Sequence, residues 1–381
     1  MPTRLEFLPN NVHWSQTPIL GQQVRQAIQN VLAKGNFILG SECAAFEEEF
    51  TTYLGAASGA GVASGTDALT LALMAGGVGP GDEVLLPDFA PGAVAVAVLA
   101  CGATPVLADV TPNLELHPVQ LAPLLSSRTR AVIAVHLYGK TADLGALLPW
   151  AKAHGLWLVE DCAHAHGAFH SAPPGTAAVR AGLLGDAGAF SFYPTKNLAG
   201  IGDGGFCVSR HPDLTREWHS LRQYGWHQRD VSMRTGRNSR LDELQAAVLR
   251  VGLRSLDDRN ARRKLLAQKY ADTLRTRVPP ECTLPDPAGN ESGSVFHQFV
   301  LQTAGRDALR EFLARAQIGT GVHYPLALHQ QPAFGAFAGG RRFPEAGALA
   351  SRVLSLPLYP ALREEDCERV CSEIIRFWNT Q

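Results

Sequence analysis

The stretch AFSFYPTKNLAGIGDGGFCVS, residues 189–209, decides how the rest of the chain is interpreted. It sets an apolar run beside a lone lysine, Lys196, which a cluster of glycines follows. Lysine is rarely buried because its charge is costly to remove from water, and glycines gather where the backbone turns tightly or lets another group approach closely. The stretch therefore predicts an amine held beside a bound ligand. A lysine in a solvated loop is the competing interpretation, which the glycines and the aromatic pair Phe192 and Tyr193 disfavour.

The composition is that of a well-packed globular enzyme. The chain has 381 residues, 46% of them hydrophobic and 18% charged, and this length predicts two structural lobes. A net charge of −1 suggests neither a nucleic-acid partner nor an anionic membrane. Seven scattered cysteines without a CxxC pair suggest reduced thiols, and residues 1–14 lack the apolar core of a signal peptide. We expect a cytoplasmic protein.

Apolar runs alternate with helical patterns along the first two thirds of the chain. Seven runs predict strands, at residues 59–63, 83–87, 104–108, 131–136, 156–161, 187–193 and 205–209. Apolar residues at helical spacing precede or separate them, at residues 17–33, 42–55, 67–75, 93–100 and 144–154. This alternation is typical of an α/β fold with a mostly parallel, seven-stranded sheet that helices flank on both faces.

The remaining third of the chain predicts a second, smaller lobe. One long helix is expected from near Arg240 through residue 274, and further helices at residues 306–317 and 364–378. We therefore expect a large domain at residues 1–255, with the N-terminal segment included, and a smaller α+β domain at residues 256–381.

Ligands of open α/β sheets bind beyond the carboxyl ends of the strands, so the residues after each strand matter most. Ser64-Gly65-Thr66-Asp67 follows the first strand and opens a helix, where free backbone N–H groups favour an anion such as phosphate. An ordinary helix cap by Ser64 or Thr66 is the competing interpretation. The preceding GAGVAS, residues 59–64, approximates a dinucleotide fingerprint but lacks the acidic residue that would follow a second strand.

Two further strands end in residues that carry chemistry. Asp161 ends the strand at 156–161, where a buried carboxylate needs a cation unless it caps a helix. Cys162, His164 and His166 follow at alternate positions, but no fourth ligand stands at a spacing typical of zinc. Ser191 lies five residues before Lys196 and offers a hydroxyl to the same anion as Thr66.

An anion cradle, a carboxylate and a lysine in this order are the parts that pyridoxal phosphate requires. Its phosphate needs the helix terminus, and its ring nitrogen stays protonated beside a carboxylate such as Asp161. Its aldehyde needs a lysine for a Schiff base, which Lys196 supplies.

The chain resembles the DegT/DnrJ/EryC1/StrS family of sugar aminotransferases, which are fold-type I pyridoxal-phosphate enzymes. The resemblance spans nearly the whole chain and rests on the motifs ASGTDAL, PGDEVLLP, GATPVLADV, HLYG, VEDCAHAHGA, FSFYPTKNLAGIGDGG, NSRLDELQAA and HYPLALHQQP. It implies that Lys196 and Asp161 are catalytic, with Lys196 as Schiff-base lysine and later general base. The cofactor-binding residues that it implies are Gly65, Thr66, Asp161, His164, Ser191, Lys196 and Asn238. Among these, Asn238 would reach the phosphate bound by the neighbouring subunit, so the resemblance implies a homodimer with shared active sites. The substrate-binding residues would be Phe89, Arg240, His323, Tyr324 and His329.

Two departures from the family pattern stand out. Pro91 and Val94 occupy positions where many members have a ring-stacking aromatic residue and a threonine, and Phe89 is a candidate substitute. The stretch at residues 170–182 is longer than usual and predicts a surface loop.

The resemblance implies that the chain moves an amino group from glutamate to a nucleotide-linked keto-deoxysugar by a ping-pong mechanism, in which the cofactor alternates between pyridoxal and pyridoxamine phosphate. A keto-cyclitol aminotransferase of the scyllo-inosose type is one alternative. A cofactor-binding regulator without transaminase activity is another. Relatives that dehydrate sugars have a histidine in place of the lysine, so Lys196 argues against that reaction.

Overall fold

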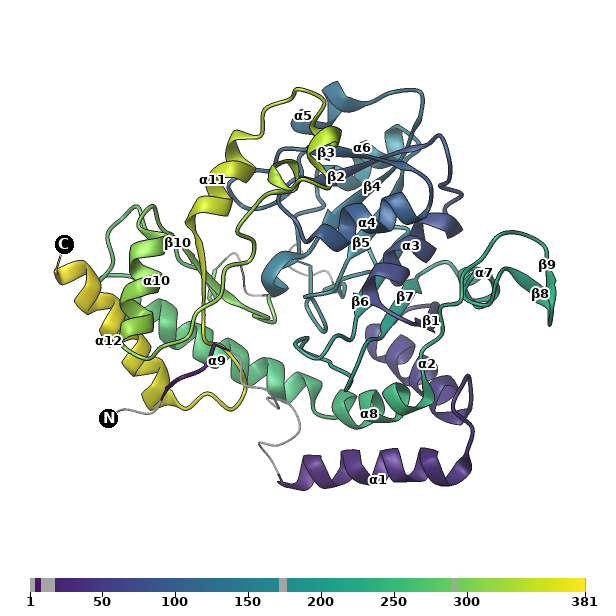
Figure 1. Ribbon diagram of the computed structural model, residues 1–381, viewed down its shortest axis with the longest axis horizontal. Coiled ribbons are helices and arrows are strands. Elements are labelled where there is room, and N and C mark those ends of the chain that lie inside the picture. Colours follow the sequence, from purple (N-terminus) through teal and green to yellow (C-terminus); the bar gives the residue numbers. More distant parts are fainter. Residues whose placement is uncertain (1–3, 8–17, 171–176, 290, 292, 381) are drawn as a thin grey trace.

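The computed structural model describes residues 4–7, 18–170, 177–289, 291 and 293–380, and it is built around one large sheet (Figure 1). The seven strands lie in the order β1-β7-β6-β5-β4-β2-β3. Their bounds are β1 (Ser58–Val62), β2 (Glu83–Pro87), β3 (Thr104–Ala108), β4 (Thr129–Val135), β5 (Trp157–Asp161), β6 (Ala187–Ser191) and β7 (Gly205–Ser209). All seven predicted strands are confirmed.

Only one strand of this sheet runs against the others. β7 pairs antiparallel with both β1 and β6, whereas the pairs β6–β5, β5–β4, β4–β2 and β2–β3 are all parallel. The mostly parallel sheet is therefore confirmed. Because the parallel strands share a direction, their carboxyl ends meet at one edge of the sheet.

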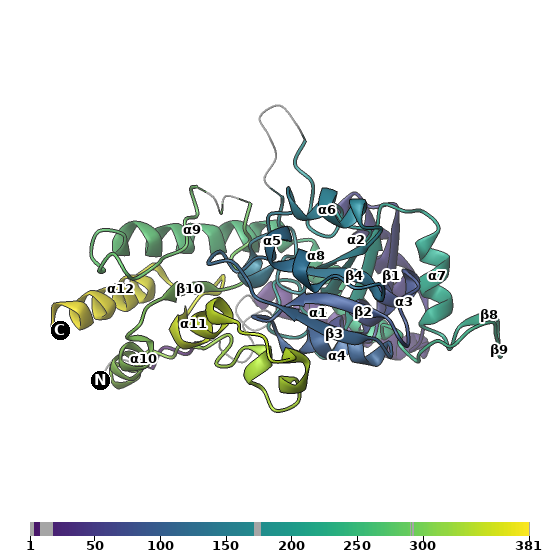
Figure 2. The same ribbon diagram turned by 90° about the horizontal axis from the view of Figure 1, so that it is seen from above.

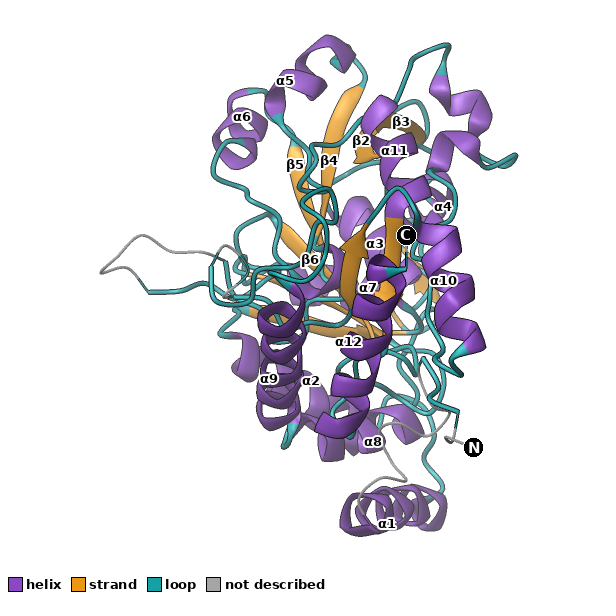
Figure 3. Cartoon of the chain, turned by 90° about the vertical axis from the view of Figure 1, so that its left-hand side faces the viewer, coloured by secondary structure: helices purple, strands orange, loops and turns teal. Residues whose placement is uncertain are grey.

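Helices cover both faces of the sheet, as Figure 3 shows. Residues of α3 (Gly65–Ala75), α4 (Gly92–Ala100) and α7 (Leu214–Leu221) share one apolar core with the strands. The opposite face packs against α2 (Ser41–Leu54) and α8 (Glu243–Leu253) at one end and against α5 (Pro118–Leu121) and α6 (Leu147–Ala153) at the other. The strands are mostly apolar because both of their faces are buried.

The N-terminal helix α1 (Pro18–Lys34) lies alongside α8 (Figure 1). Val24 of α1 packs there with Val248 and Val251 of α8. In the part of the chain that the structure describes, no helix is both long and apolar enough to cross a membrane.

A second lobe has its own core (Figure 2). It contains a two-stranded antiparallel sheet of β10 (Phe299–Gln302) and β11 (Val353–Leu356), together with α9 (Leu256–Leu274), α10 (Arg306–Arg315) and α12 (Glu364–Asn379). Leu5 joins this core and pairs with Ile318, so residues 4–7 accompany the second lobe. We propose residue 255 as the boundary between the domains, with the N-terminal segment crossing it.

The prediction of a single long helix from near Arg240 is wrong. The chain forms α8 and α9 instead, which are separated at Arg254 and Ser255. α8 packs in the core of the large lobe, whereas the later residues of α9 pack in the core of the second lobe, so the two helices separate near the point where the chain passes from one core to the other. Serine favours helix boundaries because its hydroxyl competes for backbone hydrogen bonds.

Several elements were not anticipated from the sequence. They include the helices α5, α7 and α11 (Pro344–Arg352) and the strands β10 and β11. The hairpin of β8 (Trp226–Gln228) and β9 (Val231–Ser232), which projects from the body at the right of Figure 1, was not anticipated either. The loop expected at residues 170–182 contains residues 171–176, which lie outside the described residues, as does Thr17 at the start of the first predicted helix.

Candidate active site

A cavity of about 200 Å³ lies at the carboxyl ends of the parallel strands. It brings together residues that are far apart in the sequence. The predicted site residues that line it are Gly65, Thr66, Asp161, His164, Ser191, Lys196 and Tyr324. Both residues predicted to be catalytic therefore lie in one pocket with most of the residues predicted to bind the cofactor.

The start of α3 forms one wall of this pocket. Ser64 caps the helix, because its Oγ accepts a hydrogen bond of 3.1 Å from the N–H of Asp67. Ser64 is therefore a helix cap, as the competing interpretation predicts. The amides of Gly65 and Thr66 lie in the first turn of the helix, where N–H groups have no partner within the helix. A Cβ atom at Gly65 would lie 2.5 Å from the Cβ of Ser191, so only glycine allows these two segments to approach. The result is a narrow cradle suited to an anion.

Asp161 is the last residue of β5 and is buried. Its Oδ1 accepts a hydrogen bond of 2.9 Å from the N–H of Ala163. Burial raises the pKa of Asp161, and the Ala163 hydrogen bond and the charge of Lys196 oppose this shift. A carboxylate in this position is stabilised by any cation that enters the pocket.

Lys196 lies in the turn after β6, and its N–H donates a hydrogen bond of 2.9 Å to the carbonyl of Tyr193. Burial lowers the pKa of Lys196 to about 8, while Asp161 acts in the opposite direction. At pH 7 about one Lys196 amine in ten is therefore uncharged, a far larger fraction than the ordinary pKa of lysine allows. A nucleophile or general base must be in this uncharged form.

His164 is held as a neutral ring. Burial lowers its pKa well below the ordinary value, and the charge of Lys196 adds to the shift. Its Nδ1 accepts a hydrogen bond of 3.3 Å from the N–H of Tyr138. Because a neutral imidazole carries one proton, that proton resides on Nε2 and makes it the hydrogen-bond donor of the ring.

Two residues predicted to bind substrate, Phe89 and His329, do not line the pocket. Phe89 is fully buried, and its ring meets that of Tyr324 at a centroid distance of 6.4 Å. His329 is bound to Asp88 through its Nδ1 (2.5 Å to Oδ2) and its backbone N–H (2.8 Å to Oδ1). The Asp88–His329 pair thus fastens the segment after Tyr324 to the end of β2.

The other three predicted residues also lie outside the lining of the pocket. His323 bonds through Nδ1 to the Oγ of Ser355 (2.9 Å), and burial lowers its pKa to about 4. The guanidinium of Arg240 lies 5.8 Å from the ring centroid of Tyr224. Asn238 is exposed, on a segment that pairs with Gln223.

Other residues complete the wall without having been predicted as site residues. They include Pro91, Ala93, His136, Ala163, Tyr193 and Asp203. His136 directly follows β4, so the rule that found Asp161 also points to it. Pro91 occupies the position that we compared with a ring-stacking aromatic residue, and it does line the pocket.

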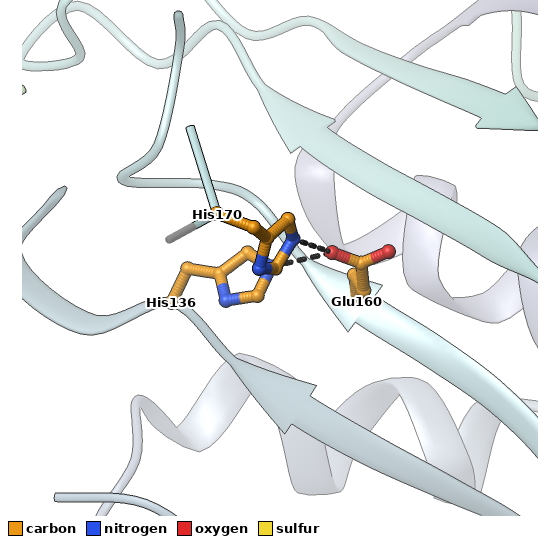
Figure 4. A group of neighbouring side chains, drawn as sticks. All are labelled: His136, Glu160 and His170. Carbon is orange, nitrogen blue, oxygen red and sulfur yellow. Dashed lines mark hydrogen bonds and ion pairs between the residues drawn. The ribbon is translucent and has the colours of Figure 1, made fainter. Parts of the chain in front are cut away.

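A buried carboxylate, Glu160, directly precedes Asp161 in the chain and faces two neighbouring histidine rings through one of its oxygens (Figure 4). Its Oε2 accepts hydrogen bonds from His136, His170 and the N–H of Gly182, at 2.8, 2.8 and 2.9 Å. Its Oε1 accepts the N–H groups of residues 184 and 185, at 2.7 and 2.6 Å. Five donors exceed the roughly four lone-pair sites of a carboxylate. These residues are close enough to hold a metal ion, but the hydrogen bonds leave no lone pair for one.

Replacing Glu160 with glutamine is expected to lower the free energy of unfolding by roughly 3–5 kcal/mol, because an amide cannot satisfy all of these donors. The histidine hydrogen bonds hold the pKa of Glu160 below its usual value despite burial. The stability that Glu160 contributes is therefore complete above the pKa of a glutamate in the unfolded chain and is lost as the pH falls below it. Urea unfolding at pH 4 and pH 7 tests this, and the variant should show the smaller loss on acidification.

Glu364→Gln is the matched control, since Glu364 forms its ion pairs with Arg262 and Lys269 at the surface. It should leave the free energy of unfolding nearly unchanged. Equal effects of the two substitutions would contradict the assignment of Glu160.

The fold and the site together define the class of the protein. A mostly parallel seven-stranded sheet carries a lysine, a carboxylate and an anion cradle at its carboxyl edge, which is the architecture of fold-type I transferases. The chain belongs to the DegT/DnrJ/EryC1/StrS aminotransferase family, whose model matches residues 18–375.

Comparison with individual proteins supports this assignment. The chain is 44% identical to a dTDP-3-amino-3,4,6-trideoxy-α-D-glucose transaminase of Streptomyces venezuelae, over 92% of this chain and 91% of the relative. It is 42% identical to a UDP-N-acetyl-3-dehydro-α-D-glucosamine 3-aminotransferase of Acidithiobacillus ferrooxidans, over 94% of both chains. Among solved structures, DesV of S. venezuelae in complex with a ketimine intermediate is similar with a TM-score of 0.89 and 40% identity, over 99% of both chains.

Proposed function

We propose that this aminotransferase uses pyridoxal phosphate to move an amino group from glutamate to a nucleotide-linked keto-deoxysugar. The observation that carries the proposal is that one cavity contains Lys196, Asp161 and the amide cradle of α3. The two relatives named above are a dTDP-sugar transaminase and a UDP-sugar aminotransferase, which supports a nucleotide sugar as acceptor. We further propose that the enzyme acts in the cytoplasm, where its seven free cysteines remain reduced.

The residues present fit the cofactor. A Cβ atom at Gly65 would fill the cradle where the phosphate group would be held by Gly65, Thr66 and Ser191. The Oγ of Ser191 accepts the N–H of Tyr193 (3.3 Å), so its own proton remains available for an anion. Asp161 would hold the ring nitrogen, and the Nε2–H of His164 is a donor for the phenolic oxygen. When bound, pyridoxal phosphate supplies an electron sink for charge that develops at the carbon bearing the amino group.

The residues of the chain then have distinct tasks. The amine of Lys196 would hold the aldehyde of the cofactor and, when free and uncharged, would accept the proton of the donor's α-carbon. Asp161 would hold the ring nitrogen in its protonated form, since a buried carboxylate is stabilised by a neighbouring cation. Tyr324 lines the mouth of the pocket, and we propose that it contacts the sugar.

We assign the remaining predicted substrate residues supporting roles in the same region. Phe89 backs Tyr324, and His329 fastens the segment that follows it. His323 and Arg240 stay as proposed contacts for parts of the substrate that extend beyond the cofactor pocket.

A homodimer with shared sites is part of the proposal. The exposed apolar residues Ile38 and Ile201 lie on segments that both adjoin the start of α8. Ile38 forms a β-bridge with Asp242, and the N–H of Ile201 donates a hydrogen bond to the side chain of Gln245. Large apolar side chains that are exposed on these segments and around the hairpin are Phe37, Ile38, Tyr193, Ile201, Tyr224, Val231 and Met233. Such a surface favours contact with a second copy, toward which Asn238 would present its side chain.

The proposal is tested by incubating the cofactor-loaded protein with glutamate and one keto acceptor at a time. The acceptors are dTDP- and UDP-linked keto-deoxysugars and scyllo-inosose, and the readout is release of 2-oxoglutarate together with the mass of the amino product. We expect turnover with a nucleotide sugar. Turnover with scyllo-inosose alone would establish the cyclitol alternative, and cofactor binding without any 2-oxoglutarate would establish the regulatory one.

A further inference from the structure

The residue after the lysine, Asn197, connects the turn of Lys196 to the second lobe. Its side chain is buried. Its Nδ2 lies 2.9 Å from the Oδ1 of Asn260 in α9 and 3.1 Å from the carbonyl of Val295, while its Oδ1 lies 3.1 Å from the Nδ1 of His297. All three partners lie beyond residue 255, whereas the turn itself continues from β6 of the large sheet.

The hydrogen bonds fix the orientation of every group in this cluster, because two of its ends are backbone carbonyls, which only accept. The carbonyl of His166 takes a hydrogen bond of 2.8 Å from the Nδ2 of Asn260, so the Oδ1 of Asn260 faces Asn197. The carbonyl of Val295 likewise requires the Nδ2 of Asn197. The Oδ1 of Asn197 therefore faces His297, whose proton must reside on Nδ1.

The cluster reaches the cofactor pocket through His297. The ring of His297 lies on that of His164, with 4.4 Å between centroids and an angle of 33° between planes. Burial lowers the pKa of both rings well below the ordinary value, so both are neutral. One side chain, Asn197, thus adjoins Lys196 in the chain and holds the ring that supports His164.

We propose that Asn197 is a positioning residue for the reaction, because it fastens the Lys196 turn and the His297–His164 ring pair to each other and to the second lobe. This inference rests on the proposed function, since it assigns Lys196 to the chemistry. Asn197 itself does not line the pocket, so it acts through these neighbours. A displacement of the reacting amine by about 1 Å can cost about 100-fold in rate.

Asn197→Ala tests the inference in the full chain. We expect kcat to fall by about 10- to 100-fold with KM for glutamate within about threefold, since the loss affects the reacting geometry rather than substrate binding. A second readout needs no turnover: acetylation of Lys196 in the cofactor-free chain, followed by mass spectrometry as a function of pH. Its midpoint should rise from about 8 in the unsubstituted chain, because a loosened turn admits water to the amine. The groups that face Lys196 electrostatically are Asp161, His164, His166, His297 and His323, and none of them is changed.

Asn260→Ala is the matched control. It removes another buried amide from the same cluster but leaves Asn197 bonded to Val295 and His297. It should lower the melting temperature about as much as Asn197→Ala while kcat stays within about threefold and the acetylation midpoint stays in place. If Asn197→Ala does not fold, His297→Phe keeps the ring packing, breaks one bond of Asn197 and should lower kcat in the same direction.

The inference is overturned if a folded Asn197→Ala or His297→Phe keeps the kcat of the unsubstituted enzyme, or if Asn260→Ala reproduces every effect of Asn197→Ala. Failure of the proposed function gives a different pattern, since the unsubstituted chain would then release no 2-oxoglutarate.

Discussion

Replacing Lys196 with alanine is expected to abolish transamination, with a loss of about 10⁴-fold or more. The substitution removes the amine that bonds the cofactor and the base that accepts the α-proton, and a positioned general base alone contributes about 10²- to 10⁴-fold. The fold should persist, because truncation removes a charge whose burial is unfavourable. Release of 2-oxoglutarate measures the loss, and thermal unfolding measures the fold.

A covalent assay identifies the lysine directly. Borohydride reduction of the cofactor-loaded unsubstituted enzyme should attach pyridoxal phosphate permanently to the peptide that contains Lys196. The Lys196→Ala variant should show no such adduct on this peptide. Lys140→Ala is the control, since Lys140 pairs with Glu115 away from the pocket. The Lys140→Ala variant should retain both the colour of the bound cofactor and the adduct on the Lys196 peptide. Near-normal activity in Lys196→Ala would refute the assignment.

Asp161→Asn is expected to lower kcat by about 10²- to 10³-fold while the protein stays folded. Removing one partner of a buried charge pair costs roughly 3–5 kcal/mol. Here the pair would consist of the Asp161 carboxylate and the protonated ring nitrogen of the cofactor. Burial raises the pKa of Asp161, so at neutral pH its ionised form destabilises the cofactor-free fold. The cofactor-free variant should therefore unfold at an equal or higher temperature than the unsubstituted chain, although its activity falls.

Asp203→Asn separates this effect from a general loss of negative charge. Asp203 lies on the wall of the same pocket but in the glycine-rich turn rather than at the end of β5. We expect it to lower kcat less than Asp161→Asn does. If Asp161→Asn were as active as the unsubstituted enzyme, or if it were inactive only because it is unfolded, the role of Asp161 would be refuted.

The sequence was sufficient for the sheet and for the centre of the site. Strands buried on both faces are mostly apolar, so their positions can be predicted from the sequence. Asp161 and Ser191 end two such strands, and Gly65 and Thr66 follow a third, so the rule that ligands bind at strand ends located them. The resemblance added residues at the mouth of the pocket, of which only Tyr324 lines it.

What the sequence could not supply depends on packing between distant segments. The pattern from Arg240 to residue 274 is helical throughout, and only the two separate cores explain the break at Ser255. Histidine is a common ligand-binding residue, but His329 instead bonds to Asp88, which lies 241 positions away in the sequence. No local sequence pattern could indicate that this histidine holds its segment against the end of β2.

The short connector that contains Tyr324 has one consequence for how the enzyme works. At one end, Gly321 pairs with Ser355 in the smaller sheet, and at the other, Leu328 donates its N–H to the carbonyl of Asp88 at the edge of the large one. The connector thus joins the two sheets through Tyr324, and a change in the angle between the lobes would move the phenol ring relative to the lysine. By thermodynamic linkage, a sugar that binds more tightly at one angle drives the lobes toward that angle in return. If Tyr324 contacts the sugar as proposed, binding of the acceptor and the angle between the lobes would be thermodynamically coupled.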